Sequence, residues 1–232
     1  MPLASPFWEP ADGWFTPFAP DLSRLSAEAR DLMAGLRALD PAEAIHLRGS
    51  VLESPAPFHR SDLDLIVVHR GDRRLALQRD VAALTRRDVD LKWIEEGALQ
   101  EDFVYYALLA HRAVHVAGPR MELSPLRADR EFAWRHWVRY FPAGLPGQLD
   151  CSCRWSVVFF KQLARCLGVL MFLREGVFTR DIDACLAYAP AIPGCDAQEL
   201  LALRRALDQG VPENRPISHL RRSLIRAFDA SP

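Results

Sequence analysis

The sequence predicts an α+β protein in which a small mixed β-sheet flanked by helices is followed by a bundle of helices. Two patterns carry this prediction. In the first half, short apolar runs with strand-like alternation are separated by stretches of helical periodicity. Beyond Gly118-Pro119, the apolar residues keep helical spacing only. The 232 residues, of which 50% are hydrophobic, are enough to bury a sizeable core.

Regular structure in the first half is expected to follow a proline- and aromatic-rich arm at residues 1–22. Asp21 or Ser23 is placed to cap a helix that runs to about Leu39. The segment 51–60 contains two prolines and is predicted to be a loop with little helix. Strands are predicted at 44–48, 63–69, 89–94 and 113–117, and helices at 75–86 and 98–112.

Helical patterns fill most of the second half. They occupy residues 121–140, 155–173, 181–188, 197–209 and 217–228, with a Pro- and Gly-rich loop at 141–149. We therefore predict three parts: the arm at 1–22, a mixed domain at 23–118 and a helical domain at 119–232.

The charge is small overall but unevenly distributed. The formal net charge is −1, which argues against a protein that binds nucleic acid by general electrostatic attraction. Residues 1–119 carry 13 basic and 18 acidic side chains, whereas residues 120–232 carry 16 and 12. An acidic first half suits metal binding, and a basic second half suits phosphate groups.

The cysteines and the N-terminus indicate a cytoplasmic protein. Five cysteines form no even disulfide framework, and Cys151-x-Cys153 lacks the second ligand pair that a zinc site needs. The first twenty residues contain no basic start followed by an apolar run, so no signal peptide is expected. No apolar stretch reaches the length of a membrane span, so no membrane partner is expected.

The most informative motif is Gly49-Ser50 followed by Ser61-Asp62-Leu63-Asp64 at the start of an apolar strand. On a strand, Asp62 and Asp64 point to the same face, where two carboxylates repel each other unless a cation lies between them. Oxygen ligands of this kind suit Mg²⁺, and the small Gly-Ser pair lets the backbone approach a phosphate. The alternative is a strand end that carries surface aspartates.

A third carboxylate follows on the next predicted strand. Val89, Leu91 and Trp93 share one face of that strand, which leaves Asp88 and Asp90 on the other. Asp90 lies inside the strand and is the first choice, with Asp88 as the alternative. A solvated strand edge explains either residue without a functional site.

The segment from Gly49-Ser50 through Asp62-Leu63-Asp64 to Asp90 resembles the nucleotidyltransferase superfamily, especially its minimal and aminoglycoside-modifying branches. The family pattern is a hydrophobic residue, Gly-Gly or Gly-Ser, a spacer, and then Asp-x-Asp or Asp-x-Glu. The resemblance covers residues 25–118 by motif and the remainder by architecture only. The proline-rich segment 51–60 departs from the short helix that is common there.

The resemblance implies transfer of a nucleoside monophosphate, AMP from ATP by default, to a hydroxyl of a small-molecule acceptor, with release of pyrophosphate. Residues 23–118 would be the nucleotidyltransferase catalytic domain and 119–232 the helical substrate-binding domain. Two Mg²⁺ ions would be held by Asp62, Asp64 and Asp90, with Asp90 as ligand or base. The nucleoside triphosphate would contact Gly49, Ser50, Ser61 and, on the long helix of the second half, Lys161.

Other readings stay open at this point. The same chemistry fits a protein adenylyltransferase of a toxin–antitoxin type module, and the same fold fits a binding module that has lost catalysis. Intact Asp62, Asp64 and Asp90 argue against the latter. Nothing indicates a groove for template nucleic acid. The pair Asp181 and Asp183 is interpreted as a helix cap rather than a second metal site, and the histidines as structural.

Overall fold

The computed structural model describes residues 7–16, 18–53, 63–71, 74–85, 88–141, 157–209 and 218–231. The described residues fall into two compact units: 14–126 form the first, and 7–13 together with 127–231 form the second. Their helices and sheets confirm the predicted α+β class. The assignment of 23–118 to catalysis and 119–232 to substrate binding stays a prediction.

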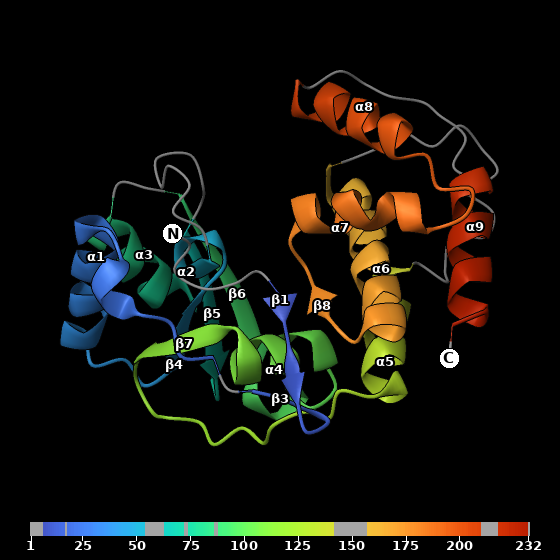
Figure 1. The fold of residues 1–232 in the computed structure, drawn as a ribbon. Coiled ribbons are helices and arrows are strands. Elements are labelled where there is room, and N and C mark those ends of the chain that lie inside the picture. The colour runs from blue at the N-terminus through green and yellow to red at the C-terminus, as the bar shows by residue number, and fades with distance from the viewer. Residues whose placement is uncertain are drawn as a thin grey trace. The chain divides into compact units, whose positions relative to one another are not determined.

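The first unit is built on a mixed sheet with the strand order β6-β5-β4-β7 (Figure 1). Strand β4 is antiparallel to both β5 and β7, whereas β5 and β6 run parallel. The strands are β4 (Ala44–Arg48), β5 (Leu63–His69), β6 (Val89–Glu95) and β7 (Ala113–Ala117). The predicted bounds of β4, β5 and β7 are confirmed, and β6 extends one residue further than predicted.

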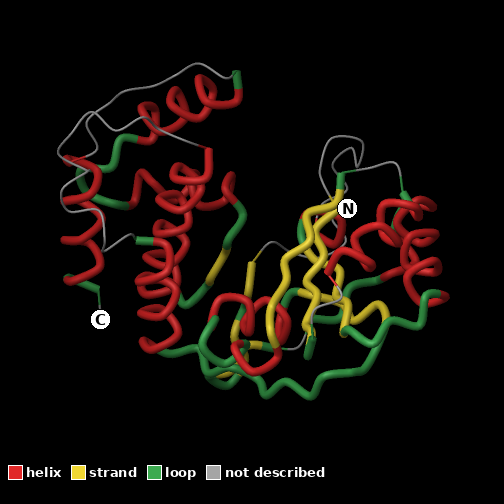
Figure 2. The backbone as a smooth tube through the Cα atoms, turned by 180° about the vertical axis from the view of Figure 1, so that it is seen from behind, coloured by secondary structure: helices red, strands yellow, loops and turns green. Residues whose placement is uncertain are grey.

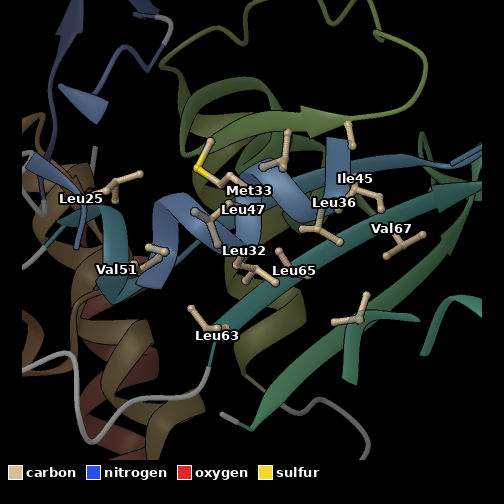
Figure 3. Packing of buried hydrophobic residues seen from close by; sticks show 14 of the residues in the cluster. Leu25, Leu32, Met33, Leu36, Ile45, Leu47, Val51, Leu63, Leu65 and Val67 are labelled. Carbon is tan, nitrogen blue, oxygen red and sulfur yellow. The ribbon is translucent and has the colours of Figure 1, made fainter. Parts of the chain in front are cut away.

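One face of this sheet carries the hydrophobic core of the unit (Figure 3). Helices α1 (Ala27–Ala38) and α3 (Arg74–Leu84) cover it, and alternate strand residues point into it because side chains on a strand have a period of two. The fully buried strand residues of this cluster are Ile45, Leu47, Leu63, Leu65 and Val67. The even-numbered residues of β5 and β6 therefore lie on the opposite face.

Two predictions about this unit were wrong in detail. Asp21 caps only a short 3₁₀ turn, Leu22–Arg24, and the longer helix α1 has its own cap, Ser26, whose Oγ accepts a hydrogen bond from the N–H of Ala29 at 3.2 Å. The loop with little helix that was predicted after Gly49 is not among them, since it begins with a single short helix, α2 (Ser50–Glu53), and residues 54–60 lie outside the described residues. Helix α4 (Phe103–His111) starts later than expected, because a 3₁₀ turn precedes it at Glu96–Ala98.

The second unit is mainly helical, as the tube view shows (Figure 2). Helix α6 (Val157–Glu175) lies at its centre and contacts four other helices. They are α5 (Arg130–Tyr140), α7 (Ile182–Tyr188), α8 (Ala197–Asp208) and α9 (Ser218–Asp229). The helix predicted at 121–140 is shorter than expected, because Asp129 caps it by accepting a hydrogen bond from the N–H of Phe132 at 3.0 Å.

The start of the chain contributes to the second unit. Strand β1 (Phe7–Trp8) pairs antiparallel with β8 (Phe178–Thr179). Trp8 is buried there, with its ring centroid 6.1 Å from that of Phe132 and 5.0 Å from that of Phe178. Tilted and edge-on ring contacts at these distances are favourable, so Trp8 of the N-terminal arm is part of the core of this unit, whereas the arm from Trp14 onward belongs to the first unit.

Among the described residues, no helix combines the length and the apolar character needed to cross a lipid bilayer.

Candidate active site

Arg48, Asp64 and Asp90 lie next to one another across the sheet of the first unit. The register pairs Arg48 of β4 with Asp64 of β5, and Asp64 with Asp90 of β6. All three lie on the face opposite the hydrophobic core, whose strand members are their sequence neighbours. The pairing of three strands therefore places one guanidinium beside two carboxylates.

The two carboxylates are bound by two basic side chains. Arg48 Nη2 lies 2.8 Å from Asp64 Oδ1 and 4.0 Å from Asp90 Oδ2. Lys92 Nζ lies 3.1 Å from Asp90 Oδ1. The side chain of Arg48 is 13% exposed, against 27% for Asp64 and 38% for Asp90, so the guanidinium lies beneath carboxylates that solvent reaches.

Gly49 is required at this point by its conformation and by Asp64. Its φ of +84° lies in the left-handed region, where residues with a Cβ are strained. A Cβ at this position would lie 2.4 Å from Asp64 Oδ2, which no real contact allows. Glycine at 49 is therefore explained by the space that the Asp64 carboxylate occupies.

Of the other predicted site residues, the structure describes some and leaves others outside the described ranges. Ser50 is the first residue of α2. Ser61 and Asp62 lie outside the described residues. Lys161 is an exposed residue of α6 in the second unit.

The strand register favours Asp90 over Asp88 as the third carboxylate. Asp90 is the direct neighbour of Asp64 in the parallel pair β5–β6. Asp88 precedes β6, is exposed, and accepts a hydrogen bond through its backbone carbonyl from the N–H of Leu63 at 2.9 Å. The geometry supports Asp90 over Asp88.

The oxygen atoms of Asp64 and Asp90 are the kind of ligand that Mg²⁺ prefers. Within the part of the chain that the structure describes, no group of three or more His, Cys, Asp and Glu residues is placed to hold a metal ion. The set predicted from the sequence includes Asp62, which is outside that part. Two neighbouring carboxylates on one solvent-reached face fit the donor chemistry of a Mg²⁺ site.

The sequence places Arg48 beside the motif, within reach of a phosphate, but the ion pair of Arg48 with Asp64 was not predicted. The Nε of Arg48 is buried and has no hydrogen-bond partner among the described residues, so the guanidinium retains an unused donor beside the carboxylates. The signal in the sequence was weak, because Arg48 and Asp64 are sixteen residues apart and meet only through an antiparallel register.

A second basic cluster lies in the second unit around Tyr140. The guanidinium carbons of Arg165 and Arg180 lie 5.9 Å and 5.7 Å from the centre of the Tyr140 ring. Burial raises the pKa of the Tyr140 hydroxyl, and neither this hydroxyl nor the Nε of Arg180 has a hydrogen-bond partner among the described residues. Arg165 lies on the helix predicted at 155–173, but no prediction from the sequence brought it together with Arg180 and Tyr140.

The histidines that were interpreted as structural have structural contacts. His111 Nδ1 lies 3.1 Å from the carbonyl of Thr16, and its Nε2 accepts a hydrogen bond from the N–H of Leu126 at 3.1 Å. His46 and His115 form an edge-on pair with ring centroids 5.3 Å apart. Burial, and then the neighbouring His115, lowers the pKa of His46 from 6.5 to about 4.

Asp181 behaves as the predicted helix cap. Its Oδ1 accepts a hydrogen bond from the N–H of Ala184 at 2.8 Å at the start of α7. Asp183 instead pairs with Arg204 of α8.

No protein-family model matches this sequence, and no curated protein is similar to it in sequence. A comparison of folds finds a match to the crystal structure of a spectinomycin adenyltransferase from Enterococcus faecialis with ATP and spectinomycin. The two chains have a TM-score of 0.52 and 13% sequence identity, and the match covers 89% of this chain and 98% of the other. The two chains therefore share an α+β fold.

Proposed function

We propose that this protein is a nucleotidyltransferase that transfers the nucleoside monophosphate of ATP to a hydroxyl of a small-molecule acceptor and releases pyrophosphate. One observation carries the proposal: Asp64 and Asp90 are direct neighbours in the sheet, and their side chains are 27% and 38% exposed. The shared fold with an adenyltransferase that was crystallised with ATP and a small-molecule acceptor supports the same chemistry.

Mg²⁺ bound to Asp64 and Asp90, with Asp62 completing the set, would supply positive charge for the phosphates and polarise the reacting oxygens. Asp90 accepts the proton of the acceptor hydroxyl. The hydroxyl oxygen forms a bond to the α-phosphorus, and the bond from that phosphorus to the bridging oxygen breaks. Pyrophosphate leaves with the electron pair, so that atoms and charge balance.

The residues that hold the triphosphate remain those proposed from the sequence. Gly49 and Ser50 directly follow Arg48 at the end of β4, next to the Asp64 carboxylate. Ser61 would add a hydroxyl contact. Lys161, whose side chain is exposed on α6, stays the lysine proposed from the sequence as a phosphate contact.

The proposal is tested with purified protein, Mg²⁺, each labelled nucleoside triphosphate and a panel of acceptors that begins with spectinomycin and the aminoglycosides. Label on a small molecule, together with release of pyrophosphate, supports the proposal. Label on a polypeptide instead would indicate a protein adenylyltransferase.

Two variants locate the reaction at the proposed site. Asp64→Asn and Asp90→Asn are expected to lower the transfer rate by at least about a hundredfold, because each removes a negative ligand or base from the site. Asp88→Asn is the matched control: it neutralises an exposed aspartate two residues from Asp90 and is expected to keep the wild-type rate. A wild-type rate in Asp64→Asn would remove that residue from the mechanism.

A further inference from the structure

We propose that Arg48 is an internal counterion: it occupies the place of the metal when the site is empty and binds the triphosphate when the metal–nucleotide complex arrives. A divalent cation alone would then bind weakly, and the nucleotide would strengthen its binding. This inference rests on the proposed function and adds a triphosphate-binding residue to it.

The first observation is that both carboxylates proposed to bind the metal ion already form ion pairs with basic side chains. Arg48 Nη2 lies 2.8 Å from Asp64 Oδ1 and 4.0 Å from Asp90 Oδ2. Lys92 takes the other oxygen of Asp90 at 3.1 Å. The other oxygen of Asp64 is packed against Gly49. A metal ion that binds both carboxylates would repel these two cationic side chains at short range, so its binding favours the displacement of at least one of them.

The two cationic side chains differ in how easily they leave. Lys92 is 43% exposed, so its ammonium can return to water at little cost. Arg48 is 13% exposed, and moving it away from Asp64 would leave a buried charge without its partner. Arg48 is therefore the residue that opposes a free metal ion.

The second observation concerns what replaces the carboxylate as a partner of Arg48. Its Nε is buried and has no hydrogen-bond partner among the described residues. A guanidinium is a planar fork of donors that matches phosphate oxygens. Arg48 also immediately precedes Gly49, where the nucleotide phosphates are proposed to lie. The triphosphate can thus replace Asp64 as the ionic partner of Arg48, while the metal ion replaces Arg48 as the ionic partner of Asp64.

Charge balance gives the same direction. Asp64, Asp90, Arg48 and Lys92 together are neutral, and Asp62 would add one negative charge, so a divalent ion alone would leave one positive charge uncompensated. A metal–triphosphate complex brings its own negative charge. By linkage, a nucleotide that strengthens metal binding must itself bind more strongly in the presence of the metal.

The test measures binding of Mn²⁺ as a probe for Mg²⁺, by the electron paramagnetic resonance signal of the free ion, with and without a non-hydrolysable ATP analogue. In the wild type, the analogue is expected to raise Mn²⁺ affinity by about tenfold or more. Arg48→Met, which keeps the length of the stem without the charge, is expected to bind free Mn²⁺ about tenfold more tightly and to lose most of the enhancement by nucleotide.

Lys92→Met is the matched control, because it removes the other cation of the same site. Since Lys92 is exposed, its removal is expected to change free Mn²⁺ affinity by no more than about threefold. Arg48→Lys keeps a charge without the fork. It is expected to fold even if Arg48→Met does not, and to show a reduced enhancement by nucleotide.

The outcomes separate this inference from the proposed function. If the wild type binds the Mn²⁺–nucleotide complex but neither Arg48 variant changes Mn²⁺ affinity or its enhancement, the inference is overturned and the proposed function stands. If the wild type binds no nucleotide at millimolar concentration, the proposed function and the inference are both overturned.

Discussion

At the scale of single residues, Gly49 links the backbone to the acidic pair. It adopts a φ of +84°, and its missing side chain leaves the space that Asp64 Oδ2 fills. The motif therefore needs glycine for a reason internal to the protein, before any phosphate is considered. A substitution here changes the conformation of the backbone and the position of a proposed ligand together.

We expect Gly49→Ala to lower the free energy of unfolding by about 1–2 kcal/mol and to weaken Mn²⁺–nucleotide binding, because the new Cβ displaces the Asp64 carboxylate. Chemical denaturation and the Mn²⁺ titration measure the two effects. Gly71→Ala is the control, since an added Cβ there meets nothing within 4 Å. Equal behaviour of the two variants would show that Asp64 does not depend on Gly49.

The site could be predicted from the sequence as far as strand alternation reaches. Alternation places Asp64 opposite the core on β5 and Asp90 opposite the core on β6, and the parallel register makes them neighbours. The ion pair of Arg48 with Asp64 was not predicted, because it depends on which strands pair and with which register. A pattern within one strand carries no such information.

At the scale of elements, strand bounds were easier to predict than the starts of helices. Strands β4, β5 and β7 are apolar runs bounded by polar residues or glycine, and their predicted limits match the structure. The start of α5 was placed nine residues too early, although Pro125 restricts the residue before it. The cap that fixes the start, Asp129, is a short-range hydrogen bond that periodicity does not report.

The buried His46 of β4 makes the stability of the first unit depend on pH. His46 is 5% exposed, and its pKa in the folded state is lowered to about 4. Between pH 6.5 and about 4 the unfolded chain binds more protons at this residue than the folded chain does. The free energy of unfolding must therefore fall as the pH falls through this window.

In the wild type, the lowered pKa of His46 accounts for at most about 3 kcal/mol of the fall in the free energy of unfolding between pH 7 and 4. We expect this part of the fall to be absent in His46→Leu. Urea unfolding curves at a series of pH values from 7 to 4 measure it. The control is His219→Leu, which removes an exposed histidine of the second unit. An unchanged pH dependence in His46→Leu would show that this histidine does not carry the acid sensitivity.

At the scale of the whole molecule, the fold class followed from the change of periodicity near Gly118, whereas the membership of the units did not. Residues 7–13 of the predicted arm belong to the second unit, through the pairing of β1 with β8. Contacts between segments about 170 residues apart leave no periodic trace in the sequence.

The arm should therefore contribute to the stability of the second unit. Trp8→Ala is expected to lower its free energy of unfolding by about 3 kcal/mol, because a 4% exposed ring is removed from an aromatic core. Trp14→Ala is the control, since that ring is 46% exposed. Thermal unfolding followed by near-ultraviolet circular dichroism compares them, and equal losses would contradict the assignment of Trp8 to this core.

Because the second unit contains two separate segments of the chain, a single continuous fragment cannot contain that unit alone. A fragment that starts at residue 127 would lack β1 and the Trp8 ring that packs against Phe132 and Phe178. The two ends that would need to be spliced are already adjacent, because the carbonyl of Gly13 accepts a hydrogen bond from the N–H of Ala128 at 2.9 Å. Excising residues 14–126 and bridging this gap with a short glycine linker is thus the natural way to produce the helical half on its own.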